Sequence, residues 1–98
     1  MGNSLKSAQF LIDSRLADAA RGDINALYEL GIVYSTGTCG VDIDMIAAHK
    51  WFNLAAVGGN VEAQYCRAEI AEDMSAREIA EAQKAARAWI ASTQRRAA

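Results

Sequence analysis

Apolar residues recur along this chain at the three- and four-residue spacings of amphipathic helices, not at every second position as in a strand. The first helix is expected over residues 4–20, with an apolar face of Leu5, Ala8, Ile12, Leu16 and Ala19. Valine and isoleucine are few and scattered, proline is absent, and alanine is abundant. Because alanine loses no side-chain entropy on becoming helical, this composition also favours helix. The chain is predicted to be all-α.

Polar capping residues mark four further helices. Side-chain oxygens of Asp, Asn and Ser accept hydrogen bonds from the unpaired amides of a first helical turn, so each is expected just before a helix. The expected caps are Asp23, Asp44, Asn60 and Ser75, the last forming a capping box with Glu78. The expected final residues are Thr36, Val57, Met74 and approximately Ser92. The short connections predict that consecutive helices are antiparallel neighbours.

A seven-residue segment occurs twice. GDINALY begins at Gly22 and GNVEAQY begins at Gly59, so glycine, a capping Asp or Asn, alanine and tyrosine return after 59 − 22 = 37 residues. Fixed periods of about 20–50 residues are typical of solenoids, in which each helical hairpin buries its apolar face against the next one. The recurrence therefore indicates two related helical units.

Gly31 lies in the middle of the second expected helix, where a glycine costs about 1 kcal/mol relative to alanine. It stands beside Leu30, and its missing side chain lets a neighbouring helix approach closely. The residues expected opposite it are the bulky pair Trp51 and Phe52 of the third helix. The second and third helices are therefore predicted to pack large residues against small ones.

The run from residue 26 to residue 56 resembles a Sel-one-like repeat. The matching positions are Ala26, Leu30, Gly31, Tyr34, Gly37, Gly40, Val41, Asp44, Ala48, Trp51, Phe52, Ala55 and Ala56. The resemblance implies a tetratricopeptide-like fold, in which helical hairpins stack into a right-handed α-solenoid (alpha-alpha superhelix), here of about five antiparallel helices.

On this resemblance, residues 1–98 form one Sel-one-like repeat domain. Its parts are an N-terminal flanking helix (4–21), one full repeat (23–58), a degenerate capping repeat (60–92) and a tail (93–98). In the degenerate repeat, Arg67 replaces Leu30, Ala71 replaces Tyr34, and the glycine loop is shortened to EDMS. The end of a solenoid needs a polar outer face, which the charged last helix would provide.

The resemblance also implies a ligand groove, because in the tetratricopeptide architecture the first helix of each pair lines the concave surface. The implied protein-binding residues are Asn25, Tyr28, Ile32, Ser35, Glu62, Tyr65, Glu69 and Glu72. The groove would bind a peptide or helical segment of another protein, and its glutamates would favour a basic one. Packing between adjacent helices is the other interpretation of Tyr28 and Tyr65, and the sequence leaves both open.

The remaining polar residues do not form a pattern with known chemistry. His49 is the only histidine and is expected at the surface. Cys39 and Cys66 lack metal-ligand spacing and are expected to be free thiols; the alternative is a disulfide, which requires that the fold bring their α-carbons within about 7 Å. The loop from Gly37 to Asp44 lacks the residues of a phosphate or calcium site. We therefore expect no enzymatic activity, no cofactor and no metal.

Charge and hydropathy narrow the class of partner. The net charge is −2 with signs interspersed, so no nucleic-acid ligand is expected, and the pair Arg95 and Arg96 is interpreted as a solvated tail. The aromatic residues Trp51, Phe52 and Trp89 are expected in the core. Without a run of about 18 apolar residues no membrane span is expected. A cytoplasmic protein is expected.

Two classes of non-enzymatic function agree with these features. The first is a protein-interaction module, an adaptor or scaffold, of the kind the resembling family supplies in bacterial regulatory and secretion pathways. The alternative is a self-associating structural subunit without a peptide ligand, forming a homo-oligomer such as a dimer. One full repeat leaves the solenoid ends uncovered, and Phe10 and Leu11 lie off the main apolar face of the first helix. A third class, an enzyme using Cys39, would require a lowered thiol pKa.

Overall fold

The computed structural model describes residues 3–97, with side chains from residue 7 to residue 94, and this part of the chain is helical throughout apart from short connections. The helices are α1 (Asn3–Ala20), α2 (Ile24–Thr36), η1 (Thr38–Gly40, a short 3-10 helix), α3 (Met45–Val57), α4 (Val61–Ala71) and α5 (Ala76–Ala97). Within residues 3–97 there is no strand. The all-α prediction is confirmed.

The predicted caps form at four helix starts. The side chains of Asp23, Asp44 and Asn60 each accept a hydrogen bond from the backbone amide three residues later, at 3.2, 3.0 and 2.8 Å. At α5, the backbone amide of Glu78 donates to Ser75 Oγ at 3.1 Å, and the amide of Ser75 donates to Glu78 Oε1 at 2.8 Å. These bonds satisfy amides that have no partner within their own helix.

Two predicted helix ends are wrong. α4 ends at Ala71 and not at Met74, because the next three amides bond to carbonyls three residues back and form a turn before Ser75 caps α5. In the other direction, α5 continues past Ser92 to Ala97, so residues 93–97 of the expected tail are helical. No glycine or proline follows Ser92, and arginine and alanine favour continued helix. The side chains of Arg95 and Arg96 lie outside the described side chains.

The repeated sequence segment adopts the same turn twice. Gly22 and Gly59 both have positive φ, 93° and 104°, which favours glycine. The following caps also match, since the amide of Asp23 donates to Asp18 O at 3.1 Å and the amide of Asn60 donates to Ala55 O at 3.0 Å. The recurrence in sequence is therefore also a recurrence in backbone geometry, and it relates the α1–α2 turn to the α3–α4 turn.

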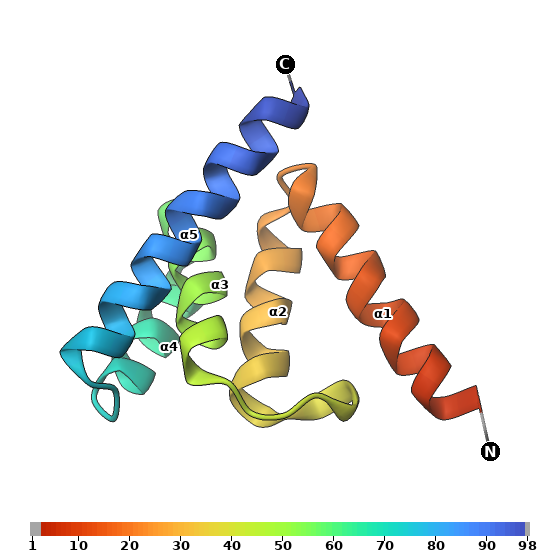
Figure 1. Cartoon of the computed structure of the whole chain (residues 1–98), viewed down its shortest axis with the longest axis horizontal. Helices are drawn as coiled ribbons and strands as arrows, with labels where there is room; N and C mark the ends of the chain where they lie inside the picture. Colours follow the sequence, from red (N-terminus) through yellow and green to blue (C-terminus); the bar gives the residue numbers. More distant parts are fainter. Residues whose placement is uncertain (1–2, 98) are drawn as a thin grey trace.

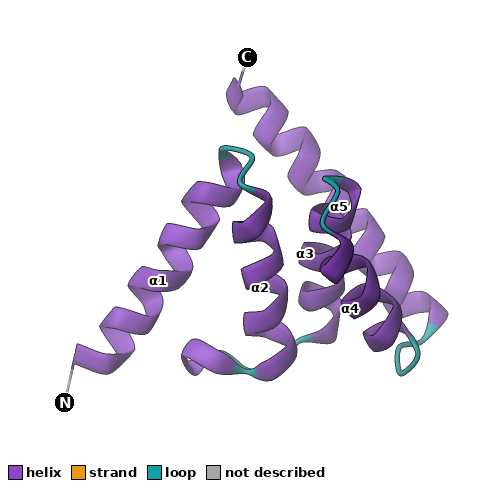
Figure 2. Cartoon of the chain, turned by 180° about the vertical axis from the view of Figure 1, so that it is seen from behind, coloured by secondary structure: helices purple, strands orange, loops and turns teal. Residues whose placement is uncertain are grey.

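The central helix is α3. It packs against α2, α4 and α5, while α1 packs against α2 and η1 on the outer side (Figure 1). The two views from opposite sides show α5 across one face of α3 and α4 across the other (Figure 2). α4 and α5 approach each other less closely than either approaches α3. These two consecutive helices therefore pack mainly on α3 and little on each other.

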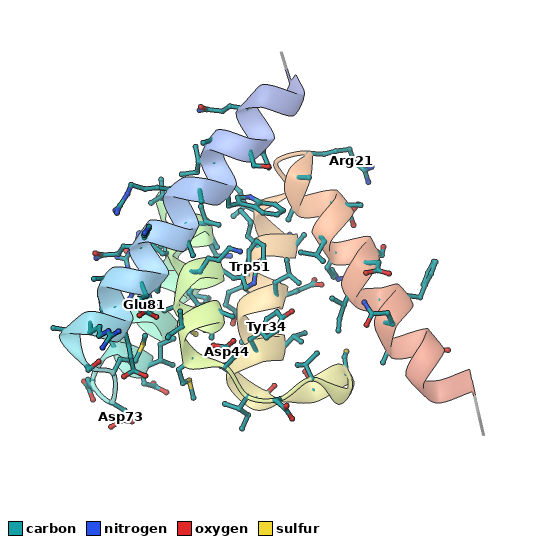
Figure 3. All side chains as sticks on the ribbon, viewed as in Figure 1. Arg21, Tyr34, Asp44, Trp51, Asp73 and Glu81 are labelled. Atoms are coloured by element: carbon teal, nitrogen blue, oxygen red, sulfur yellow. The ribbon has the colours of Figure 1, made fainter. Side chains whose placement is uncertain are left out.

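Gly31 meets Phe52, as predicted. A Cβ atom placed on Gly31 would lie 2.5 Å from two atoms of the buried Phe52 ring. The same prediction is wrong for Trp51, which points towards α5 (Figure 3) and meets the ring of Trp89 edge-on, with centroids 4.8 Å apart and an interplanar angle of 78°. Consecutive residues on a helix point about 100° apart, so Trp51 and Phe52 contact different helices.

Two other residues differ from their expected positions. His49 is buried, at 4% exposure, instead of lying at the surface. The reason is that α3 is covered on three sides, so that a position off its main apolar stripe is enclosed as well. On α5, the helical spacing of Ile79, Ala82, Ala86, Trp89 and Ile90 predicts one apolar face. Ala82 and Ala86 of this face are buried, whereas Ile90 is exposed. Leu5 of the first predicted face lies outside the described side chains.

Candidate functional site

A groove of about 370 Å³ lies between α2 and α4, with α3 beneath it. The view from behind shows these three helices together, with α4 in front of α3 and α2 beside it (Figure 2). Residues of all three helices and of the turn after α4 line this α2/α4 groove: Ile32, Ser35, Thr36, Met45, Phe52, Cys66, Glu69, Ile70 and Asp73. Its volume lies at the lower end of the about 300–1,000 Å³ typical of ligand pockets.

The floor of the α2/α4 groove is apolar. Phe52 is held from behind by the notch at Gly31, and Ile32 and Ile70 pack partly buried against the core. Met45, the first residue of α3, adds a thioether side chain that is 37% exposed. Such a floor offers burial to an apolar side chain of a ligand, and methionine adapts its shape easily to different partners.

The two rims of the groove differ in charge. On the α2 rim, the hydroxyls of Ser35 and Thr36 both donate to the carbonyl of Ile32, at 3.1 and 2.7 Å. On the α4 rim, the carboxylates of Glu69 and Asp73 have no ion-pair or hydrogen-bond partner among the described residues. The groove is therefore apolar at its floor, neutral on one side and negative on the other.

The side chain of Tyr28, on α2, lies near Phe52 of α3 and Cys66 of α4. Its ring stands 5.9 Å from that of Phe52, measured between centroids, and the two planes are tilted by 51°. The pKa of the Tyr28 hydroxyl is raised, first by burial and then by the neighbouring Cys66 and Glu62. Tyr28 thus packs between helices, which is the second of the two roles that the sequence left open for it.

The structure brings together only part of the predicted binding set. Ile32, Ser35 and Glu69 line the α2/α4 groove. Three others, Glu62, Tyr65 and Glu72, are exposed on α4 or at its end without lining the groove, and Tyr65 is 70% exposed.

Asn25 is placed differently from the prediction. It lines a shallow polar pocket against α1, together with Arg15, Asp18 and Glu29. Asn25 therefore does not line the α2/α4 groove, because the start of α2 turns this side of the helix towards α1.

Sequence reasoning missed the groove residues Cys66, Ile70 and Asp73. On α4 the groove face runs through positions 66, 69, 70 and 73, whereas the predicted set ran through 62, 65, 69 and 72. The three- and four-residue spacing of these positions was the available signal. It was missed because the predicted positions on α4 were transferred from α2 by the 37-residue offset.

A second hollow, the α1/α2 cleft, is a separate feature of about 260 Å³. It is lined by Leu11, Ile12, Arg15, Glu29, Leu30, Ile32, Val33 and Cys39. Arg15 and Glu29 form an ion pair between α1 and α2. Beside this cleft, Phe10 is 71% exposed on α1. The cleft and Phe10 make an apolar surface on the α1 side of α2, and Ile32 lines both this cleft and the α2/α4 groove.

The two cysteines are free thiols, as expected, and lie at different sites. Cys39 borders the α1/α2 cleft and Cys66 the α2/α4 groove. Among the described residues, no three or more His, Cys, Asp or Glu side chains are grouped so that they could hold a metal ion. None of the described helices has the length and apolar character needed to cross a membrane.

Comparisons with known proteins found no matching protein-family model, no matching curated protein and no matching solved structure.

Proposed function

We propose that this chain is a protein-interaction module, an adaptor or scaffold whose α2/α4 groove holds a peptide or helical segment of another protein. The observation that carries the proposal is the groove itself, an apolar floor open to solvent above the buried Phe52 ring and between two polar rims. Covering such a floor removes apolar surface from water, which is the main favourable contribution in most protein associations.

The resemblance to Sel-one-like repeats supports the same proposal. We propose that α2 and α3 form the full repeat, that α4 and α5 form the degenerate one, and that the stack is right-handed. The matching turns at Gly22 and Gly59 and the contact between Gly31 and Phe52 support a repeat with close helix packing. A non-enzymatic, cytoplasmic role in a bacterial regulatory or secretion pathway is part of this proposal and rests on the resemblance alone.

Blocking the groove tests the proposed function. Ser35→Trp places an indole into the groove from α2, and Ser92→Trp adds the same group on the exposed side of α5 as the matched control. In affinity capture from a cell lysate, a partner held in the groove should be lost with Ser35→Trp and retained with Ser92→Trp. Both variants are first shown to be folded by circular dichroism. Equal recovery of the partner by the two variants would refute binding in the α2/α4 groove.

Self-association is a second candidate, favoured by the exposed Phe10 beside the α1/α2 cleft. In this case Phe10→Ser should reduce the mass measured by light scattering at high protein concentration, while Ser35→Trp should not. A mass equal to the 10.5 kDa of one chain at every concentration would exclude this candidate.

A further inference from the structure

We infer that the α2/α4 groove selects a segment in which an arginine stands about one helical turn from an apolar side chain. The apolar side chain covers the groove floor, and the guanidinium lies between the carboxylates of Glu69 and Asp73. This inference rests on the proposed function and adds to it the chemistry of the partner.

The position of the two carboxylates is the first reason. Glu69 and Asp73 are four residues apart on the same rim of the groove. Glu69 lies near the end of α4 and Asp73 in the turn that follows Ala71, and like charges on one edge of a groove repel each other. A cation placed between them turns this repulsion into two attractions, so the rim is complementary to a positively charged group.

Among the described residues, the basic side chains of α3 and α4 do not supply that cation. Arg67, on α4, donates to Asn53 Oδ1 of α3 at 2.6 Å. The ammonium of Lys50 lies over the rings of Trp51 and Trp89, 4.1 and 5.5 Å from their centroids. These two cations of α3 and α4 are therefore engaged elsewhere, and the lining of the groove contains acidic residues but no basic one.

The arrangement favours arginine over lysine. A guanidinium carries five N–H donors in a flat fork, which can serve two carboxylates at once, whereas an ammonium is a compact point charge with a stronger hold on water. The volume of about 370 Å³ accepts one or two side chains, not an entire helix. The apolar floor and the acidic rim are adjacent, which requires the two recognised side chains of the ligand to be adjacent too.

The test selects ligands without assuming a partner. A phage library of random 12-residue peptides is panned against the immobilised full chain, and the recovered peptides are synthesised with a fluorescent label. Their affinities are measured by anisotropy for the wild type, for Glu69→Gln/Asp73→Asn, and for the matched control Glu81→Gln/Asp13→Asn. The control makes the same change in net charge at exposed acidic residues that do not line the groove. Ser35→Trp identifies the peptides that bind in the groove.

The inference predicts that peptides displaced by Ser35→Trp carry arginine beside an apolar residue. Their affinity should fall about tenfold or more in Glu69→Gln/Asp73→Asn, remain within about twofold in the control, and fall when their arginine is replaced by citrulline. Groove-binding peptides without a basic residue, or with equal affinity for both double variants, would overturn the inference and leave the proposed function standing. A library from which no peptide sensitive to Ser35→Trp is recovered would overturn both.

Discussion

Gly31 and Phe52 meet across the interface of α2 and α3, directly behind the α2/α4 groove. The ring of Phe52 is 1% exposed and occupies the space that a Cβ atom of residue 31 would need. The glycine is less favourable in a helix than alanine, and the close approach of α3 offsets that cost. The position of the groove floor therefore depends on the absence of a single methyl group.

Gly31→Ala should lower the free energy of unfolding by about 1–2 kcal/mol, because overpacking costs about 1–3 kcal/mol and alanine regains at most about 1 kcal/mol of helix propensity. Urea unfolding followed by circular dichroism measures this change. In a Phe52→Leu background, which removes the ring that the methyl group would meet, the same substitution should cost nothing or stabilise the protein. An equal loss in both backgrounds would show that the contact with Phe52 is not the cause.

His49 is buried within the α3 packing, and its Nδ1 atom has no hydrogen-bond partner among the residues that the structure describes. Burial lowers the pKa of the imidazole below its ordinary value of 6.5, and the positive charge of Arg67 on α4 lowers it further. The unfolded chain therefore binds a proton at a higher pH than the folded chain does. Stability from this group is fully present above about pH 6.5 and is lost as the pH falls below that value towards the pKa of the folded state.

His49→Leu should remove this loss. Between about pH 7.5 and pH 5, the free energy of unfolding of the wild type should decrease, by at most about 1.4 kcal/mol per pH unit, whereas that of the variant should stay nearly constant. Because His49 is the only histidine, no other side chain has its ordinary pKa in this range. Parallel decreases in the two proteins would refute the assignment.

At the residue scale, the sequence predicts on which side of its helix a residue lies, because the helical period determines this. The period places Phe52 opposite Gly31 and buries Leu30 and Ala55. It does not reveal how many neighbours a helix has, and this is why the burial of His49 was missed. Trp51 was assigned to the wrong neighbour for the same reason, since the second helix that covers α3 cannot be identified from α3 itself.

At the scale of elements, an aromatic pair joins α5 to α3, in addition to the buried Ala82 and Ala86 of α5. Trp89 packs edge-on against Trp51, and the ammonium of Lys50 lies over both rings. Edge-to-face pairs contribute about 0.5–1.5 kcal/mol beyond the burial of their surface, and an ammonium over an indole contributes about 0.5–1 kcal/mol at partly exposed sites. These contacts hold α5 to α3 instead of to α4.

Trp89→Ala should therefore lower the free energy of unfolding by about 2–4 kcal/mol, near the low end for tryptophan truncation because Trp89 is only partly buried. Ile90→Ala is the matched control on the next residue, which is 39% exposed, and should cost less than about 1 kcal/mol. Hydrogen exchange should show faster opening of α5 in Trp89→Ala but not in Ile90→Ala. Equal effects of the two substitutions would contradict the role of the tryptophan pair.

Helix starts were predictable because their causes are local. Asp23, Asp44 and Asn60 each bond to an amide three residues away, and a short stretch of sequence contains both partners. The packing of α5 on α3 was not predictable, because it depends on Trp51 and Trp89, which are separated by 38 residues, 89 − 51. The end of α4 was only partly predictable. The capping box at Ser75 shows from the sequence that α4 must end before Ser75, but not at which residue.

At the scale of the whole molecule, the sequence predicted that α2 and α4 line the same groove. It predicted only some of the residues of each helix that line that groove. The 37-residue offset was applied to positions on α2, and this placed Glu69 correctly and Tyr65 wrongly with respect to the groove. Positions that line a surface in one repeat can be assigned to the next repeat by a fixed offset only if both repeats pack in the same way. Here α4 is shorter than α2 and stands apart from α5, so its groove-facing side differs.

The most direct test of the central claim is a titration of the ¹⁵N-labelled full chain with a groove-selected peptide, followed by NMR. The account predicts that the largest shift changes fall on the backbone amides of Ile32, Ser35, Glu69, Ile70 and Asp73, which line the α2/α4 groove. The same titration of Ser35→Trp should show none of these changes. Shift changes centred on α1 and the α1/α2 cleft, or changes that persist in Ser35→Trp, would contradict the account.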